Sequence, residues 1–109
     1  MAAVLLVKGM IAYGRLHDFA QAVDTFASYR RQRGWADPEV LYGLAGPMNT
    51  VLMIFRYREV HDWELECAAE RDDPQYGRIA SQLPYSAGSI QYELYQSTGA
   101  TPPSTRPAS

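Results

Sequence analysis

The segment Thr50-Val51-Leu52-Met53-Ile54-Phe55-Arg56-Tyr57 decides the fold. It is rich in β-branched and aromatic residues and contains neither Gly nor Pro, which predicts a β-strand. Side chains on a strand point alternately to two faces. One face carries Val51, Met53, Phe55 and Tyr57, and the other carries Thr50, Leu52, Ile54 and Arg56. Neither face is polar, so we expect both to be covered. The chain has helices for one cover only, and a second copy of the chain is the simplest source of the other.

Length and composition bound the class of protein. The 109 residues are enough for one domain with one core. Ten Lys and Arg residues against twelve Asp and Glu give a net charge of −2, which argues against a nucleic-acid-binding protein. The single cysteine, Cys67, excludes an intramolecular disulfide. The apolar start of the chain is too short for a membrane span and has no basic residues ahead of it, so we expect a cytoplasmic protein without a membrane partner.

Six further patterns flank the central segment. Alternation predicts strands over residues 4–13, 39–45 and 89–96, and helical periodicity predicts helices over residues 16–33, 59–71 and 74–83. Residues 46–49 have the composition of a hairpin turn. We therefore expect residues 1–96 to form one domain. Residues 97–109 have no large apolar side chain, which predicts a flexible C-terminal tail.

The first predicted helix has one buried stripe, formed by Phe19, Val23, Phe26, Ala27 and Arg30. Its last turn carries Arg30, Arg31 and Arg33. Cations there complement the helix dipole, which is the interpretation favoured by the acidic net charge. A binding site for an anion is the alternative reading of this cluster.

The order strand, helix, strand, strand, helix, strand predicts an α+β, ferredoxin-like fold with a four-stranded antiparallel sheet. Right-handed crossovers place both helices on one face of the sheet. On the open face we expect Lys8, Met10, Met53, Phe55, Tyr57, Glu93 and Tyr95. A face this apolar marks an interface or a ligand site.

Two short motifs resemble NIPSNAP-like proteins. Val51 to Tyr57, an acidic helix and then Asp73-Pro74-Gln75-Tyr76 resemble a strand that ends in aromatic-Arg-Tyr and a helix with an Asp-Pro-Glu-Trp-like break. Gln75 and Tyr76 here replace the Glu and Trp of that pattern. The stretch Gly14-Arg15-Leu16-His17-Asp18-Phe19 is similar to the family's Gly-Lys-x-x-x-Phe start of the first helix. The resemblance covers roughly residues 4 to 96.

The resemblance implies a dimeric α+β barrel, in which the open sheet faces of two protomers meet around a cavity. The wider superfamily includes cofactor-free monooxygenases, haem-degrading monooxygenases, lactone isomerases, cyclases and stress-response proteins. The fold does not choose between these activities. NIPSNAP-like proteins offer no shared catalytic residue set to carry over.

Three residues are candidates for catalysis. Lys8 and Glu93 lie on strands that neighbour each other in this fold, and as a buried pair they would suit acid–base chemistry. A structural ion pair is the alternative. His61, at the start of the second helix, is a candidate general base or haem ligand, with a surface histidine as the alternative.

Aromatic and Met side chains are the candidates for ligand binding: Met10, Tyr42, Met53, Phe55, Tyr57, Trp63 and Tyr95. They suit the walls of a pocket for a flat aromatic molecule, and packing across a dimer is the alternative. The sequence has no Gly-rich phosphate loop, nucleophile elbow or metal-ligand cluster, so we expect no cofactor and no metal.

The sequence therefore predicts a homodimer that binds a small apolar organic molecule. A cofactor-independent monooxygenase, isomerase or cyclase is one reading of it, and whether the protein is catalytic stays open. A non-catalytic stress-response or interaction protein is the alternative, and a haem-binding or haem-degrading protein is a third reading.

Overall fold

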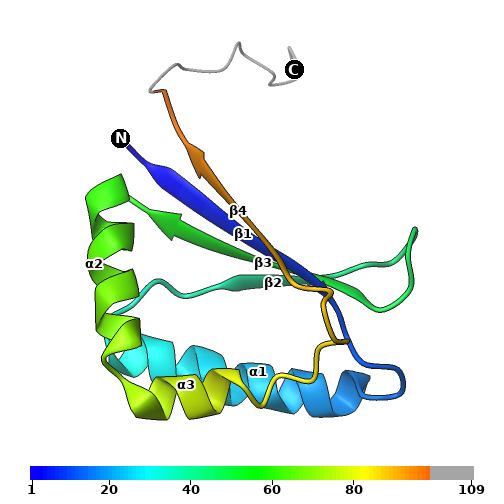
Figure 1. Ribbon diagram of the computed structural model, residues 1–109. Helices are drawn as coiled ribbons and strands as arrows, with labels where there is room; N and C mark the ends of the chain where they lie inside the picture. Colours follow the sequence, from blue (N-terminus) through cyan, green and yellow to red (C-terminus); the bar gives the residue numbers. More distant parts are fainter. Residues whose placement is uncertain (99–109) are drawn as a thin grey trace, which may run out of the picture.

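The computed structural model describes residues 1–98 and contains one sheet and three helices (Figure 1). The elements in chain order are β1 (Ala3–Met10), α1 (Leu16–Gln32), β2 (Glu39–Tyr42), β3 (Thr50–Tyr57), α2 (Val60–Arg71), α3 (Pro74–Ala80) and β4 (Gln91–Gln96). The sheet is antiparallel with the order β2-β3-β1-β4, as the ferredoxin-like prediction requires. The predicted tail, apart from Ser97 and Thr98, lies outside the described residues.

The predicted elements are present, and β3 has the predicted bounds. β2 ends at Tyr42 rather than at residue 45, because the chain then enters a turn in which Gly46 and Asn49 both have positive φ. β1 ends at Met10, and Ile11 forms an isolated bridge with Tyr85 instead. Both strands are shorter than predicted because the backbone stops pairing with the neighbouring strand at these positions.

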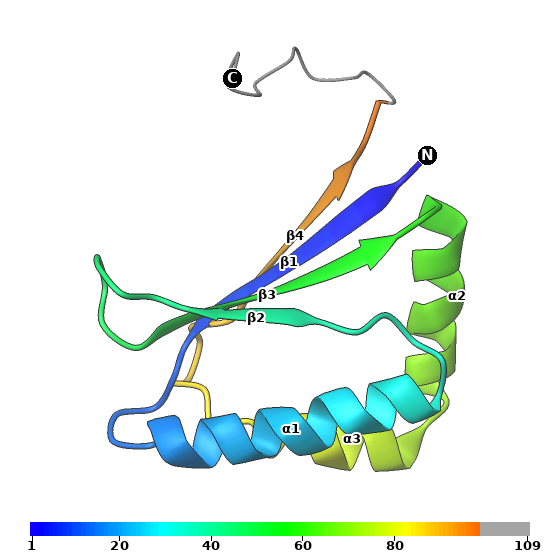
Figure 2. The same cartoon turned by 180° about the vertical axis from the view of Figure 1, so that it is seen from behind.

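All three helices lie on one face of the sheet, and the two views in Figures 1 and 2 agree on this. α1 and α3 lie beneath the sheet and contact each other, whereas α2 stands steeply at one end of it (Figure 1). None of the helices among residues 1–98 combines the length and the apolar character needed to cross a bilayer.

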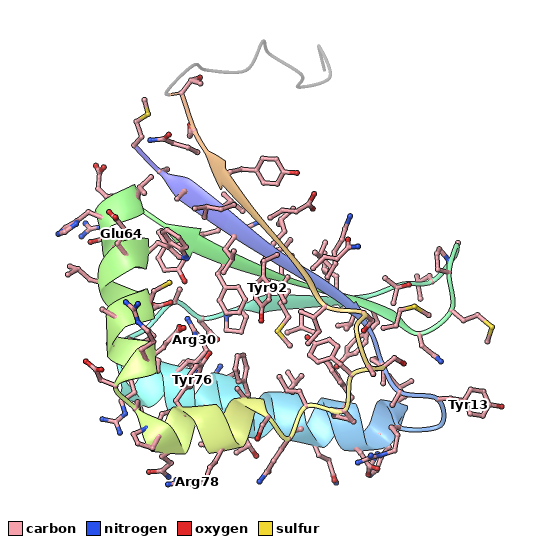
Figure 3. All side chains as sticks on the ribbon, in the orientation of Figure 1. Tyr13, Arg30, Glu64, Tyr76, Arg78 and Tyr92 are labelled. Atoms are coloured by element: carbon pink, nitrogen blue, oxygen red, sulfur yellow. The ribbon has the colours of Figure 1, made fainter. Side chains whose placement is uncertain are left out.

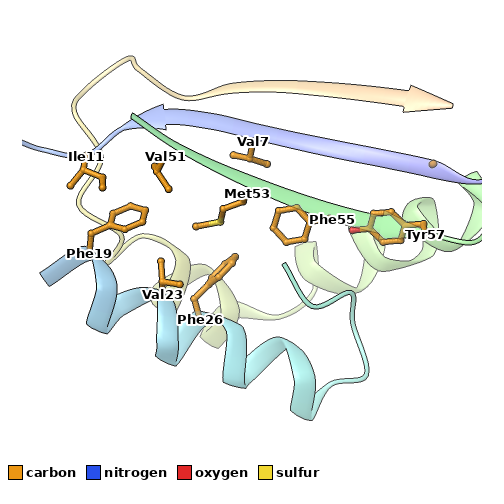
Figure 4. Packing of buried hydrophobic residues seen from close by; sticks show 10 residues of the cluster. Val7, Ile11, Phe19, Val23, Phe26, Val51, Met53, Phe55 and Tyr57 are labelled. Atoms are coloured by element: carbon orange, nitrogen blue, oxygen red, sulfur yellow. The ribbon is translucent and has the colours of Figure 1, made fainter. Parts of the chain in front are cut away.

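The core lies between α1 and the two central strands. Phe19, Val23 and Phe26 of α1 point at the odd-numbered residues of β1 and β3 (Figure 4). Phe19 and Val51 are fully buried. The helical stripe predicted for residues 16–33 is therefore confirmed, and its fifth member, Arg30, is buried as well.

The predicted face is wrong for Met53, Phe55 and Tyr57. These residues pair directly with Val7, Leu5 and Ala3, and they belong to the core beneath the sheet. Both stripes of β3 are apolar, so alternation alone does not say which one faces the helices. The stripe with the larger aromatic side chains packs against the aromatic stripe of α1, and the aliphatic stripe is left outside.

The open face is apolar even so. It carries Val4, Leu6, Lys8, Met10, Leu41, Leu52, Ile54, Glu93 and Tyr95. Lys8, Met10, Glu93 and Tyr95 are therefore on the predicted face. Its centre consists of Leu6, Leu52 and Ile54, which are only partly buried.

We predict that Gly9→Ala destabilises the protein. A Cβ at Gly9 would lie 2.5 Å from a ring carbon of Tyr85, so the ring would have to move. We expect the free energy of unfolding in urea to fall by about 1–3 kcal/mol, as in other overpacked cores.

Gly77→Ala is the matched control. A Cβ at Gly77 meets no heavy atom within 4 Å, and the residue lies in α3. Alanine should raise the free energy of unfolding there by up to about 1 kcal/mol, because it is the better helix former. Equal effects at the two sites would contradict the packing argument.

Candidate functional site

A pocket of about 460 Å³ opens between the helix-covered face of the sheet and helices α2 and α3. Its apolar walls include Leu5, Val7, Phe26, Met53, Phe55 and Trp63. The connection between α3 and β4 closes one side with Leu83 and Tyr85. Pockets of this size and character hold small organic molecules.

The polar end of this pocket is built on Arg30. Its side chain is 1% exposed, and its guanidinium lies over the Phe55 ring, 4.7 Å from the ring centroid. Figure 3 shows Arg30, Tyr76 and Tyr92 inside the angle between sheet and helices, whereas Glu64 and Arg78 lie at the outer side. A charge so deeply buried must be paired.

Arg30 is paired on every side. Nε donates to the Ala36 carbonyl at 2.8 Å, Nη1 donates to Glu70 and to the Tyr76 hydroxyl at 2.8 Å each, and Nη2 donates to Glu66. Burial alone would lower the pKa of Arg30, but Tyr76 and the two carboxylates outweigh it and raise the pKa. The guanidinium is a fixed cation whose donors are already engaged with protein groups.

Glu66 is saturated by three donors. Arg30 and the Tyr57 hydroxyl both donate to Oε2, and the backbone N–H of Ala36 donates to Oε1 at 2.8 Å. Burial, followed by the hydrogen bond to Glu66, raises the pKa of Tyr57. Tyr57 therefore stays a neutral donor, and Glu66 has a structural part in the site.

Glu70 and Tyr76 are only partly satisfied. Among the described residues Glu70 accepts one hydrogen bond, from Arg30, and its side chain is 25% exposed. Burial raises the pKa of the Glu70 carboxyl in spite of Arg30, and the nearby Glu66 adds to the rise. Burial likewise raises the pKa of Tyr76 to about 12, so its hydroxyl keeps its proton. Both residues line the pocket.

Two further side chains that line the pocket, those of Cys67 and Tyr85, stay protonated at neutral pH. Burial raises the pKa of the Cys67 thiol, so it stays protonated at neutral pH. The buried Tyr85 hydroxyl has no hydrogen-bond partner among residues 1–98, and burial raises its pKa to about 12. Its ring packs edge-on against Phe19, with the centroids 5.1 Å apart.

Four of the residues predicted for ligand binding line the pocket: Met53, Phe55, Tyr57 and Trp63. Three do not. Met10 and Tyr95 lie on the open face, and Tyr42 packs edge-on near Phe19, with the centroids 6.4 Å apart.

The candidates for catalysis lie away from this pocket. Lys8 and Glu93 form an ion pair of 3.8 Å on the open face, with side chains 50% and 42% exposed. His61 is 74% exposed on α2, 3.7 Å from the Glu64 carboxylate. A part for any of them in chemistry stays a prediction. No group of three or more His, Cys, Asp or Glu side chains within residues 1–98 is placed to hold a metal ion.

Arg30, Glu70 and Tyr76 are the site residues that sequence reasoning missed. A signal was present in the first helix, where Arg30 falls on an otherwise apolar stripe. A buried arginine requires carboxylates, and α2 carries Glu66 and Glu70 one turn apart. Arg30 lies in the last turn of α1 as predicted, and in addition its guanidinium bonds to side chains across the core, which the sequence reasoning did not foresee.

Comparison with known proteins places the fold. No protein-family model and no curated protein matches the sequence. A NIPSNAP family protein from Agrobacterium tumefaciens matches with a TM-score of 0.74 at 13% identity, over 94% of this chain and 98% of that one. A NIPSNAP-like domain protein from Burkholderia xenovorans matches with a TM-score of 0.73 at 16% identity, over 94% and 90%.

A third solved structure with this fold is described as a "Putative antibiotic biosynthesis monooxygenase" from Nitrosomonas europaea. It matches with a TM-score of 0.68 at 14% identity, over 92% of this chain and 93% of that one. At such identities the similarity shows a shared fold. The α+β arrangement is thus that of NIPSNAP proteins, as the sequence resemblance implied.

We predict that Arg30→Met lowers the free energy of unfolding by about 3–5 kcal/mol at neutral pH, because two buried carboxylates lose their cation. Burial already raises the pKa of the Glu70 carboxyl, and without Arg30 that folded-state pKa lies further above that of the unfolded chain. The stability that Glu70 contributes is then lost as the pH rises through this pKa, and the deficit shrinks in acid, where its carboxyl is protonated in either state. Urea unfolding at several pH values measures this.

Arg31→Met is the control from the next position in α1. Arg31 forms an exposed ion pair with Asp37, at 3.0 Å and with side chains 53% and 54% exposed. We expect a loss below about 1 kcal/mol there. A loss of similar size in both variants would show that the buried cluster does not hold the helices.

Proposed function

We propose that this protein binds a small, largely apolar and flat organic molecule in the pocket between the sheet and helices α2 and α3. The observation that carries this is the pocket itself: about 460 Å³, with apolar and aromatic walls and with its two charged side chains, Arg30 and Glu70, hydrogen-bonded to each other. This combination favours an aromatic body with one polar substituent.

A cofactor-independent reaction on that molecule is the activity we propose for the pocket. The partly satisfied Glu70 and the neutral Tyr76 hydroxyl supply a proton acceptor and a proton donor beside apolar walls, which general acid–base catalysis needs. The description of the Nitrosomonas europaea protein, which shares the fold, supports a monooxygenase as the reaction class.

We also propose that two copies pair through the open sheet face. Leu6, Leu52 and Ile54 form an apolar centre there, opposite the helix-covered side. A continuous apolar face on a chain of this size is typical of an interface. Pairing would also bury the exposed Lys8–Glu93 ion pair, and the same face carries the Arg56–Glu39 ion pair at 2.8 Å.

The pocket is tested with N-phenyl-1-naphthylamine, a neutral flat molecule that fluoresces in apolar surroundings. We expect saturable binding by the wild type. Ala80→Phe should weaken binding at least tenfold, which corresponds to about 1.4 kcal/mol, because the ring occupies the pocket beside Tyr76. Ala69→Phe, on the exposed side of α2, should bind like the wild type. Absence of binding by the wild type would refute the proposal.

The pairing is tested by sedimentation at micromolar concentration. We expect a particle of about twice 12.2 kDa for the wild type and of 12.2 kDa for Ile54→Arg, because a charge at the centre of the open face prevents its burial. Leu65→Arg, at a 57% exposed position on α2, should remain paired. A 12.2 kDa wild-type particle would exclude the pairing.

A further inference from the structure

Some groups at the polar end of the pocket have donors or acceptors that form no hydrogen bond to any of residues 1–98. Arg30 has at least four of its five N–H groups engaged with Ala36, Glu66, Glu70 and Tyr76. Glu70 accepts a single bond, and the Tyr76 hydroxyl accepts from Arg30 without donating to any described residue. Beside Arg30 a ligand therefore meets a free acceptor on Glu70 and a free donor on Tyr76, while the Tyr85 hydroxyl, unpartnered among residues 1–98, is a further donor in the wall of the same pocket.

These two groups lie side by side. The same nitrogen, Nη1 of Arg30, donates to Glu70 Oε2 and to the Tyr76 hydroxyl at 2.8 Å each. They converge on one place at the end of the apolar walls, where both line the pocket. A single ligand oxygen placed there accepts from Tyr76 and donates its own proton to Glu70. Only a hydroxyl group satisfies both partners.

The charges of the site select the form of that hydroxyl. One guanidinium and two carboxylates, those of Arg30, Glu66 and Glu70, leave one negative charge beside the pocket. A ligand that enters as an anion adds a second negative charge in apolar surroundings, and among residues 1–98 the lining of this pocket offers it no cation besides Arg30, which is already paired. A neutral ligand adds none, and a proton that it passes to Glu70 leaves the total charge unchanged.

We propose that the pocket prefers, among neutral flat molecules, one with a weakly acidic hydroxyl, a phenol or an enol, and that Glu70 accepts its proton. In this step the O–H bond of the ligand breaks, and an O–H bond forms on the Glu70 carboxylate. The electron pair stays on the ligand oxygen as phenolate or enolate. Tyr76 donates to that oxygen, and Arg30 fixes Tyr76. The inference rests on the proposed binding function and assigns its ligand class.

The raised pKa of Glu70 agrees with this role. Burial raises it, so the carboxylate is a stronger base than an exposed glutamate. Glu66 accepts three hydrogen bonds from protein groups, is 8% exposed and does not line the pocket. Of the two carboxylates, Glu70 is therefore the one with access to a ligand.

Three probes of one shape test the inference: 4-nitrophenol, 4-nitroanisole, which lacks the proton, and 4-nitrobenzoate, which is an anion. Binding is measured by calorimetry below the pKa of 4-nitrophenol. We expect the wild type to bind the phenol at least about tenfold more tightly than the anisole, since a hydrogen bond to a charged group is among the stronger ones. The benzoate should not bind. The absorption band of the bound phenol should shift to the red.

Glu70→Gln should reverse this order. An amide that accepts from Arg30 through its oxygen turns its NH₂ group to the ligand, so the preference for phenol over anisole and the red shift disappear, and benzoate binding appears. Tyr76→Phe should weaken phenol and anisole alike, because both offer an acceptor oxygen. Glu64→Gln, at an exposed position of the same helix, should behave as the wild type.

The outcomes separate the two proposals. If the wild type binds phenol and anisole equally and Glu70→Gln changes nothing, the ligand class is wrong while the binding function stands. If no probe binds to the wild type, the binding function fails and the ligand class fails with it.

Discussion

The buried charge of Arg30 is the constraint on which the rest of the structure depends. A guanidinium that is 1% exposed is tolerated only when its donors are paired, and the partners of Arg30 come from the two other helices, α2 and α3, and from the connection before β2. Four aromatic rings surround it, the nearest being Phe55. The residue thus joins α1, α2 and α3 to one another on the helix-covered face of the sheet.

The same arrangement explains why a pocket exists beside it. A polar cluster needs its directions and distances preserved, so the helices are unable to collapse onto the sheet around it. α2 stands steeply and contacts β3, and the helix-side residues of β4 remain exposed, Tyr92 at 69% (Figure 1). The sheet therefore keeps apolar side chains that face the pocket, such as the half-buried Leu5. These side chains form the floor of the pocket.

The sequence was sufficient to predict the helices and strands, their order and an open apolar face of the sheet. The elements follow from local periodicity, and the open face follows from the right-handed crossovers. The sequence was insufficient where two apolar stripes competed, as in β3, since only the size match with Phe19 and Phe26 decides which stripe turns inward. It also missed the polar end of the pocket. Arg30 and Glu70 are 40 residues apart, and each reads alone as an ordinary helical charge. Only the packing of α1 against α2 and α3 makes them a site.

Different elements supply the floor and the polar end of the pocket, and this separation is relevant to a fold that occurs in proteins with little sequence similarity. The floor belongs to β1 and β3, whose side chains also form the core, and substitutions there affect stability first. The polar end belongs to the helices, where Glu70 and Tyr76 sit at the edge of the cluster rather than at its centre. Those two positions can change while Arg30 and Glu66 keep the helices in place. The solved structures of the same fold share only 10–16% of their residues with this chain, so the fold itself does not depend on any particular set of helical side chains.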